Sequence, residues 1–267
     1  MSAAQSSDNT GIDASTLKTH YILGTKVHAT SYTQSVETIL SWAASAQPRY
    51  VCAANVHMVM EGYDSEPFRN NVNRADLVTP DGMPLVWVLR RQAARDASRV
   101  YGPDLTLHLL KAAQDAGTPV GFFGGRPEVL QSLLKRIQTQ YPGLPVAYSY
   151  APPFRPLTAE ENGAICRDIA ESGTRILFVG LGCPKQETWM AENSRGVPVV
   201  MVGVGAAFDF LSNSVRQAPK WVRSAGLEWA FRFTQEPRRL WRRYLKHNPR
   251  FLVRAFTQRQ PLSPPPA

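Results

Sequence analysis

A single carboxylate, Asp81, lies between a proline and a glycine in the stretch LVTPDGMPLVW, residues 77–87. A short apolar run precedes it, and another apolar run follows at once. An acid that directly follows a buried segment is well placed to act on a ligand rather than on solvent. Such a carboxylate could take the proton of a hydroxyl group as that hydroxyl attacks an electrophile. The alternative is a turn-forming Asp before Gly, which is a common structural use of that dipeptide.

Other polar residues follow apolar runs in the same way. Asn55 and His57 come after the run VCAA, and Gly205 comes directly after VVMVGV. Gln186 lies in the polar turn GCPKQE, which follows the run ILFVG. Gln186 could bind a ligand through its amide, or it could be solvated. His57 could be a base or a ligand contact, and a structural histidine explains the position equally well.

The stretch GGRPE, residues 124–128, has the composition of a phosphate-binding turn. The glycines Gly124 and Gly125 would let backbone N–H groups approach a ligand. Pro127 suits the first position of a helix, whose N-terminus attracts phosphate. A tight turn between strand and helix is the alternative interpretation.

The common nucleotide and metal motifs are absent from the sequence. GLGCPK and GVGAAF contain G-x-G without the third small residue, and no G-x-x-x-x-G-K-[ST] occurs. There is no D-x-D acid pair and no closely spaced set of His and Cys ligands. We therefore expect no metal, no cofactor and no effect of EDTA on the reaction. Cys183 lacks an identifiable partner base, so we expect a packed thiol.

Short apolar runs and helical patterns alternate along the chain and would position these residues. Six stretches predict strands that lead into turns: residues 49–59, 75–82, 119–130, 145–153, 174–187 and 197–210. Helical spacing occurs between them, for example over residues 128–141 and 159–172. The alternation predicts an α/β fold with a mainly parallel sheet and helices on both faces. Ligands of such sheets bind beyond the carboxyl ends of the strands, where Asp81 is expected.

Composition predicts one globular domain with a basic appendage. The chain has 267 residues, is 43% hydrophobic and carries a net charge of +9. Residues 216–259 hold 12 of the 30 Lys and Arg but 2 of the 21 Asp and Glu, so the rest is nearly neutral. We expect disordered ends over residues 1–18 and 259–267, a catalytic domain over 19–213 and an appendage over 214–258. Three cysteines and the short apolar run 198–208 favour a reducing cytoplasm without a membrane span.

The appendage has the pattern of a basic amphipathic helix. Its apolar residues at helical spacing are Leu240, Trp241, Tyr244, Leu245, Phe251, Leu252, Ala255 and Phe256, and Lys or Arg residues fill most positions between them. Pro249 is expected to break or kink the segment. A membrane-surface element and a core-packed helix with a solvated basic face both fit this pattern.

Several long motifs, in order, carry a resemblance to a known family. They are ADLVTPDGMPLVW, RVYGPDL, GFFGGRPEVLQ, LFVGLGCPKQETWM and the segment GVGAAFDF through HNPRFL. Together they resemble the bacterial WecG/TagA/CpsF glycosyltransferases, which include teichoic-acid N-acetylmannosaminyltransferases, common-antigen N-acetylmannosaminuronic acid transferases and exopolysaccharide glucosyltransferases. The resemblance implies a Rossmann-like domain with a membrane-associated appendage. It also implies inverting, metal-independent transfer from a UDP-sugar to a saccharide on polyprenyl diphosphate.

The family's residues carry over onto matching positions. The resemblance places the general base on Asp81 and substrate contacts on Asn55, Arg99 and Gln186. The chain departs from the family at Ala53, where many members have Thr, and at His57, where many have Glu. The donor sugar is therefore left open between UDP-glucose and UDP-N-acetylmannosamine types.

Without a metal, the leaving diphosphate needs positive charge and N–H donors. We expect these from a set of substrate-binding residues: Arg99, Gly124, Gly125, Gly205, Arg232, Arg239 and Arg242. The expected partners are the UDP-sugar donor, the lipid-linked acceptor and the anionic inner surface of the cell membrane. We expect no nucleic acid among the partners. Whether the protein forms a homo-oligomer is left open. An NAD-dependent enzyme and a nucleic-acid binder are the rival functions.

Overall fold

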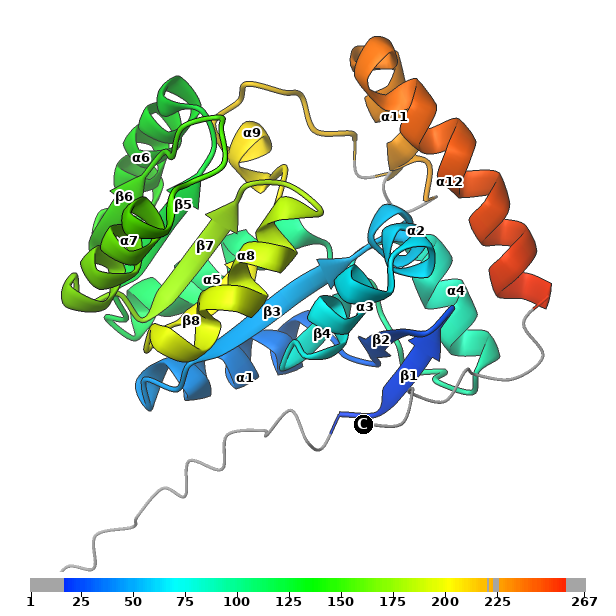
Figure 1. The fold of residues 1–267 in the computed structure, drawn as a ribbon, viewed down its shortest axis with the longest axis horizontal. Coiled ribbons are helices and arrows are strands. Elements are labelled where there is room, and N and C mark those ends of the chain that lie inside the picture. Colours follow the sequence, from blue (N-terminus) through cyan, green and yellow to red (C-terminus); the bar gives the residue numbers. More distant parts are fainter. Residues whose placement is uncertain (1–16, 220, 223–225, 258–267) are drawn as a thin grey trace, which may run out of the picture.

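A six-stranded parallel sheet forms the centre of the protein, in a computed structural model that describes residues 17–219, 221–222 and 226–257 (Figure 1). The strand order is β4-β3-β8-β7-β5-β6, and every pairing in it is parallel. The strands are β3 (Arg49–Ala54), β4 (Leu77–Pro80), β5 (Val120–Gly124), β6 (Val146–Tyr150), β7 (Ile176–Gly180) and β8 (Val200–Gly203). Each lies within one of the six stretches predicted from the sequence, so the α/β Rossmann-like prediction is confirmed.

Helices pack on both faces of the sheet because successive strand residues point to opposite sides. Phe122 and Phe178 belong to one buried core, and Phe123 and Val179 belong to the other. The first core is covered by α1 (Tyr32–Ala44), α5 (Gly102–Asp115), α6 (Pro127–Gln140) and α9 (Ala207–Leu211). The second is covered by α2 (Val56–Asp64), α3 (Glu66–Asn73), α4 (Met83–Arg91), α7 (Ala159–Glu171) and α8 (Lys185–Asn193).

The two helices predicted by residue range, over 128–141 and 159–172, are α6 and α7. Pro127 is the first residue of α6, as expected. Thr158 begins α7 with a capping box: its hydroxyl accepts from the Glu161 N–H at 3.1 Å, and the Glu161 carboxylate accepts from the Thr158 N–H at 2.9 Å. Such caps satisfy backbone donors that the first turn leaves unpaired.

A hairpin that the sequence analysis missed covers the edge of the sheet. Strands β1 (Thr19–Ile22) and β2 (Thr25–His28) pair antiparallel through a turn at Leu23 and Gly24, which have φ of 50° and 84°. The Nδ1 atom of His28 accepts a hydrogen bond from the Val78 N–H of β4 at 2.9 Å. Burial lowers the pKa of His28 to about 4, so the imidazole stays a neutral acceptor. The hairpin thereby shields an edge strand that would otherwise be open to pairing.

The C-terminal appendage contains α11 (Glu228–Gln235) and α12 (Pro237–Thr257). Helix α12 continues through Pro249, so the helix does not break there, and the alternative that Pro249 kinks it stays a prediction. Its apolar residues divide between two sides: Phe251 and Ala255 join the second core, whereas Leu245 and Val253 are 68% and 64% exposed. Figure 1 shows α12 beside α2 and α4, and the guanidinium carbon of Arg91, on α4, lies 5.8 Å from the centroid of the Phe256 ring on α12.

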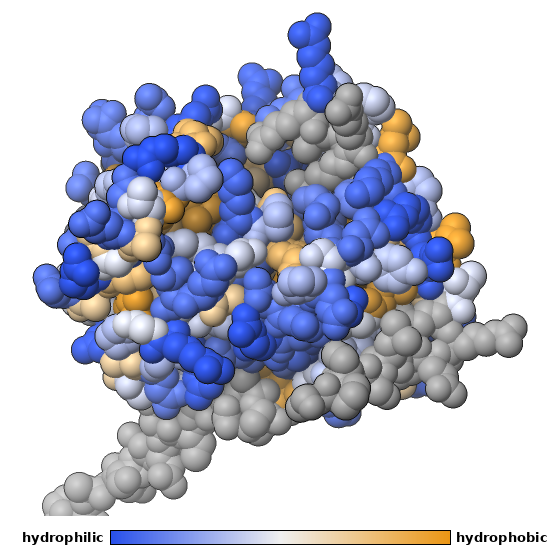
Figure 2. Space-filling view, in the orientation of Figure 1, coloured by the Kyte–Doolittle hydropathy of each residue, from blue (hydrophilic) through white to orange (hydrophobic). Residues whose placement is uncertain are grey.

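The appendage is therefore not independent of the body's core, although its predicted boundary near residue 213 stays a prediction. The predicted disordered ends fall almost wholly on residues 1–16 and 258–267, outside the described residues. On the face shown in Figure 2, hydrophilic residues dominate and apolar ones form small, separate groups. Within the described ranges, no helix combines the length and the apolar character needed to cross a membrane.

Candidate active site

The candidate site begins where β4 and β3 end side by side. Asp81 directly follows β4, and its N–H donates to the Ala54 carbonyl oxygen at 2.8 Å. Gly82 is the N-cap of α4, so the chain turns from strand to helix within two residues of Asp81. The parallel pairing of β3 with β4 also brings Asn55 to the same edge. The structure thus brings together two of the predicted residues.

The Asp81 carboxylate lies in a partly desolvated environment. Its Oδ1 atom accepts a hydrogen bond from the Gly102 N–H at 3.1 Å, at the start of α5. A Cβ atom on Gly102 would lie 3.5 Å from the Ala53 Cβ, so α5 begins close against β3. Burial raises the pKa of Asp81 to about 6, although the charge of Arg99 and the hydrogen bonds from Gly102 and Asn55 lower it. A carboxylate with such a pKa is ionised at neutral pH and is a stronger base than an ordinary Asp.

Asn55 has two contacts that explain its position. It is the N-cap of α2, and its Oδ1 atom accepts from the Met58 N–H at 3.2 Å. A side-chain hydrogen bond from Asn55 to Asp81 also stabilises the ionised carboxylate and lowers its pKa. The residue thus serves the fold as a cap and adjoins the predicted base. A contact with substrate stays a prediction.

Arg99 connects the Asp81 turn to the appendage. Its Nε atom donates to the Asp81 carbonyl oxygen, and its Nη2 atom lies 2.6 Å from the Glu228 Oε2 atom of α11. The Tyr101 hydroxyl donates to the other oxygen of Glu228 at 2.6 Å. The Arg99 guanidinium carbon also lies 4.3 Å from the Tyr101 ring centroid. Sequence reasoning missed Glu228, which places an acid of the basic appendage next to the predicted site.

Gln186 joins the loops that follow β7 and β8. Its Oε1 atom accepts from the N–H groups of Gly182 and Gly205, each at 3.1 Å, and its Nε2 atom donates to Glu187 at 2.7 Å. The residue is 4% exposed. Gln186 and Gly205 are therefore brought together, but the amide is used within the protein. The geometry assigns Gln186 to loop positioning, while direct substrate contact by either residue stays a prediction.

The two glycines after β5 serve a close approach between strands. A Cβ atom on Gly124, which has φ of 122°, would lie 2.6 Å from the Gly180 carbonyl carbon. The Gly125 N–H donates to the Gly180 carbonyl oxygen at 3.1 Å, so this amide is already engaged. The structure thus supports the tight-turn interpretation for Gly125. Phosphate contact by the pair stays a prediction, and the exposed Arg126, the N-cap of α6, lies beside it.

A cavity of about 440 Å³ lies beyond the ends of β5 and β7. Its lining includes Gly125, Phe123 and Trp189, together with the cations Arg155 and Lys185. The rings of Phe123 and Trp189 lie 4.5 Å apart, centroid to centroid. Apolar rings beside cationic groups suit a ligand with both a ring and a negative charge.

The appendage arginines are placed only in part. The guanidinium carbon of Arg232, on α11, lies 5.3 Å from the Phe210 ring centroid of α9, which follows β8. Its Nε atom is buried and has no hydrogen-bond partner among the described residues. Arg239 and Arg242 lie on α12, but their side chains are outside the described part of the chain. Of the three, Arg232 alone has a described side chain, and its unpaired donor is compatible with an anionic ligand.

Comparison with known protein families shows a match over most of the chain. The family model of the WecG/TagA/CpsF glycosyl transferases matches residues 20–264. The matched range includes the sheet, every predicted site residue and the appendage helices α11 and α12.

Proposed function

The chain belongs to the WecG/TagA/CpsF glycosyltransferase family, and on that premise we propose that it moves a sugar from a UDP-sugar to a saccharide on polyprenyl diphosphate, with inversion. The setting would be bacterial exopolysaccharide or cell-surface polysaccharide synthesis, with a donor of the UDP-glucose or UDP-N-acetylmannosamine type. The observation that carries the proposal is Asp81, a carboxylate at a strand end with a pKa raised to about 6. Membership of a glycosyltransferase family also argues against the two rival functions, an NAD-dependent enzyme and a nucleic-acid binder.

Asp81 acts as the general base in this proposal. The acceptor hydroxyl gives its proton to the carboxylate while its oxygen forms a bond to the anomeric carbon and the bond to UDP breaks. Base assistance of this kind contributes about 10²–10⁴-fold to a rate. The Gly102 N–H and the Arg99 guanidinium hold the Asp81 turn in place for the transfer.

Positive groups near the strand ends support the departure of UDP. Arg99 is held by Glu228, and the Arg232 guanidinium has a buried Nε donor with no hydrogen-bond partner in the described ranges. Charged hydrogen-bond donors stabilise a leaving diphosphate without a metal ion. The cavity beside Trp189 and Lys185 offers an apolar lining and a cation for the nucleotide.

Incubation with a panel of UDP-sugars and a short lipid-diphosphate acceptor tests this function. Transfer from one donor, detected as a mass increase of the acceptor by one sugar, is the expected result. UDP should raise the melting temperature, whereas NAD should leave it unchanged. Stabilisation by NAD without sugar transfer would contradict the proposal.

The transfer chemistry is expected to be independent of Mg²⁺ and Mn²⁺. The sequence lacks the D-x-D pair that would bind such an ion beside a diphosphate, and Arg99 and Arg232 supply positive charge instead. Adding either ion to metal-stripped protein should leave kcat within about twofold of its value without the ion. A rate that depends on either ion would show that a catalytic ligand set exists.

Membrane binding through the appendage is expected to depend on salt. The exposed large apolar residues described in this segment are Trp221, Leu227, Trp229, Trp241, Leu245, Leu252 and Val253. Each Lys or Arg near an anionic surface contributes roughly 1 kcal/mol, and salt screens that attraction. The protein should therefore pellet with anionic liposomes at low salt and release at high salt. Equal binding to neutral liposomes would contradict the electrostatic part of this prediction.

A further inference from the structure

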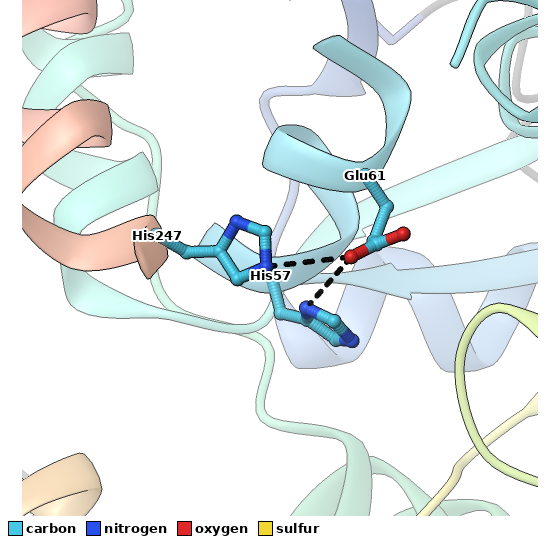
Figure 3. Close-up of side chains that lie close together, drawn as sticks. All are labelled: His57, Glu61 and His247. Atoms are coloured by element: carbon cyan, nitrogen blue, oxygen red, sulfur yellow. Dashed lines mark ion pairs between the residues drawn. The ribbon is translucent and has the colours of Figure 1, made fainter. Parts of the chain in front are cut away.

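A second cluster of polar side chains joins the appendage to the body. His57 and Glu61 lie on α2, and His247 lies on α12 (Figure 3). The Glu61 Oε1 atom is 3.7 Å from the His57 Nδ1 atom and 3.3 Å from the His247 Nε2 atom. One ligand atom from each residue lies within 4.8 Å of the other two. The three side chains therefore converge on one point from two helices.

These distances and atom types suit a divalent transition-metal ion. Zinc binds imidazole nitrogen and carboxylate oxygen at about 2.0–2.2 Å, so two ligands on a tetrahedral ion lie roughly 3.3–3.5 Å apart. The two measured separations to Glu61 are close to that range. His57 and Glu61 are four residues apart and so share one face of α2. Small side-chain movements would complete a site with three protein ligands.

His247 is enclosed between α12 and α2. The residue is 4% exposed, and the centroid of its ring lies 5.1 Å from that of the His57 ring. Both imidazoles and the Glu61 carboxylate therefore lie within one small part of the interface between the two helices.

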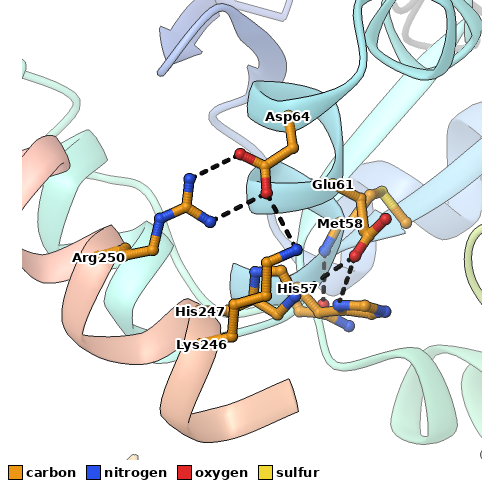
Figure 4. A network of polar contacts seen from close by, with 8 residues as sticks. His57, Met58, Glu61, Asp64, Lys246, His247 and Arg250 are labelled. Carbon is orange, nitrogen blue, oxygen red and sulfur yellow. Dashed lines mark hydrogen bonds and ion pairs between the residues drawn. The ribbon is translucent and has the colours of Figure 1, made fainter. Parts of the chain in front are cut away.

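We propose that His57, Glu61 and His247 bind one zinc-class divalent cation that ties α12 to α2. Other contacts between these helices flank the site (Figure 4). The Arg250 guanidinium forms two hydrogen bonds with Asp64, at 2.9 and 2.7 Å, and the Lys246 Nζ atom lies 3.3 Å from the same carboxylate. The ion would reinforce these contacts between α2 and α12. Its ligand His57 lies two residues after Asn55, the N-cap of α2. The site is structural and does not depend on the proposed transfer reaction.

Titration of metal-stripped full-length protein with ZnCl₂ tests the site. Calorimetry should give one tightly bound Zn²⁺ per chain, and Zn²⁺ should raise the melting temperature by several degrees. Mg²⁺ and Ca²⁺ should have no such effect, because they prefer sets of oxygen ligands. Zn²⁺ should also slow tryptic cleavage after Lys246 and Arg250, because it holds α12 against α2.

Variants separate this site from adventitious zinc binding. His57→Gln, Glu61→Gln and His247→Gln should each weaken Zn²⁺ binding by at least about tenfold. His108→Gln is the matched control, since His108 contacts Tyr32 elsewhere and should keep full Zn²⁺ affinity. Asp64→Asn removes the neighbouring ion pairs but leaves the ligands, so the melting-temperature increase with Zn²⁺ should persist.

Two outcomes would overturn the proposal. One is wild-type Zn²⁺ affinity in both His57→Gln and Glu61→Gln, which change partly exposed residues and test the site even if His247→Gln fails to fold. The other is a wild-type protein whose melting temperature and tryptic cleavage do not respond to Zn²⁺.

Discussion

Replacing Asp81 with Asn is expected to lower kcat at least about a hundredfold and to leave UDP affinity near that of the wild type. Asn keeps the size of the side chain and an oxygen that can accept from the Gly102 N–H, but it cannot take a proton from the acceptor. The melting temperature should not fall above pH 6, because the raised pKa shows that folding disfavours the charged carboxylate. Steady-state kinetics, UDP calorimetry and thermal unfolding check these three outcomes.

The pH profile gives the same prediction a second readout. A base must be unprotonated, and the pKa of Asp81 is raised to about 6. The wild-type kcat/KM should therefore fall about tenfold per unit as the pH drops below 6. The residual activity of Asp81→Asn should lack this decline. Asp104→Asn, which changes another carboxylate at the start of α5, is the matched control and should keep both rate and profile.

Retention of wild-type kcat by Asp81→Asn would remove Asp81 as the base. A wild-type kcat/KM that does not change between pH 7 and pH 4 would also contradict the assignment of Asp81 as the base, even if Asp81→Asn were inactive.

The sheet was predictable because its signals are local. A run such as ILFVG, ended by glycines, specifies a buried strand and its turn without reference to the rest of the chain. Asp81 could be predicted for the same reason, since its neighbours Pro80 and Gly82 mark the end of a strand. The Pro127 helix start is another local signal that the structure confirms.

Three features that the sequence did not predict depend on distant contacts. Glu228 meets Arg99 across 129 positions, and its place in a basic segment suggested no role at the site. His247 meets Glu61 in the same way, so the i and i+4 pair His57 and Glu61 had no visible third member. Pro249 was expected to break or kink the segment, but packing of Phe251 into the core favours a continuous α12.

Deleting the residues after Asn213 is expected to abolish both sugar transfer and binding to anionic liposomes. The deletion removes α11 and α12, and with them Glu228, Arg232 and the exposed apolar residues. It also removes Phe251, which is fully buried, and burial of such a side chain contributes up to about 3 kcal/mol. The truncated body should therefore melt at a lower temperature than the full chain. Transfer to a soluble acceptor, liposome sedimentation and thermal unfolding measure the three effects.

A point variant separates the catalytic role of the appendage from its contribution to stability. Glu228→Gln leaves α12 and the core in place but removes the charge that Arg99 and Tyr101 contact. Because Glu228 helps to raise the pKa of Asp81, the variant should lower that pKa and shift the acid limb of kcat/KM to lower pH. Glu236→Gln, at the end of α11, is the matched control and should leave the limb in place.

The two variants together decide whether the appendage acts on the site or only supports the fold. If α11 tunes Asp81 through Glu228, the acid limb moves in Glu228→Gln while liposome binding persists, because the basic and apolar residues of α12 remain. If the appendage only anchors the protein, the acid limb of kcat/KM stays near pH 6 in Glu228→Gln. A folded truncated protein would then transfer sugar to a soluble acceptor at the full-length rate, and that result would refute the catalytic role. Coupling through Arg99 and Glu228 would make transfer depend on a docked appendage, so that full activity is reached where the lipid-linked acceptor is found.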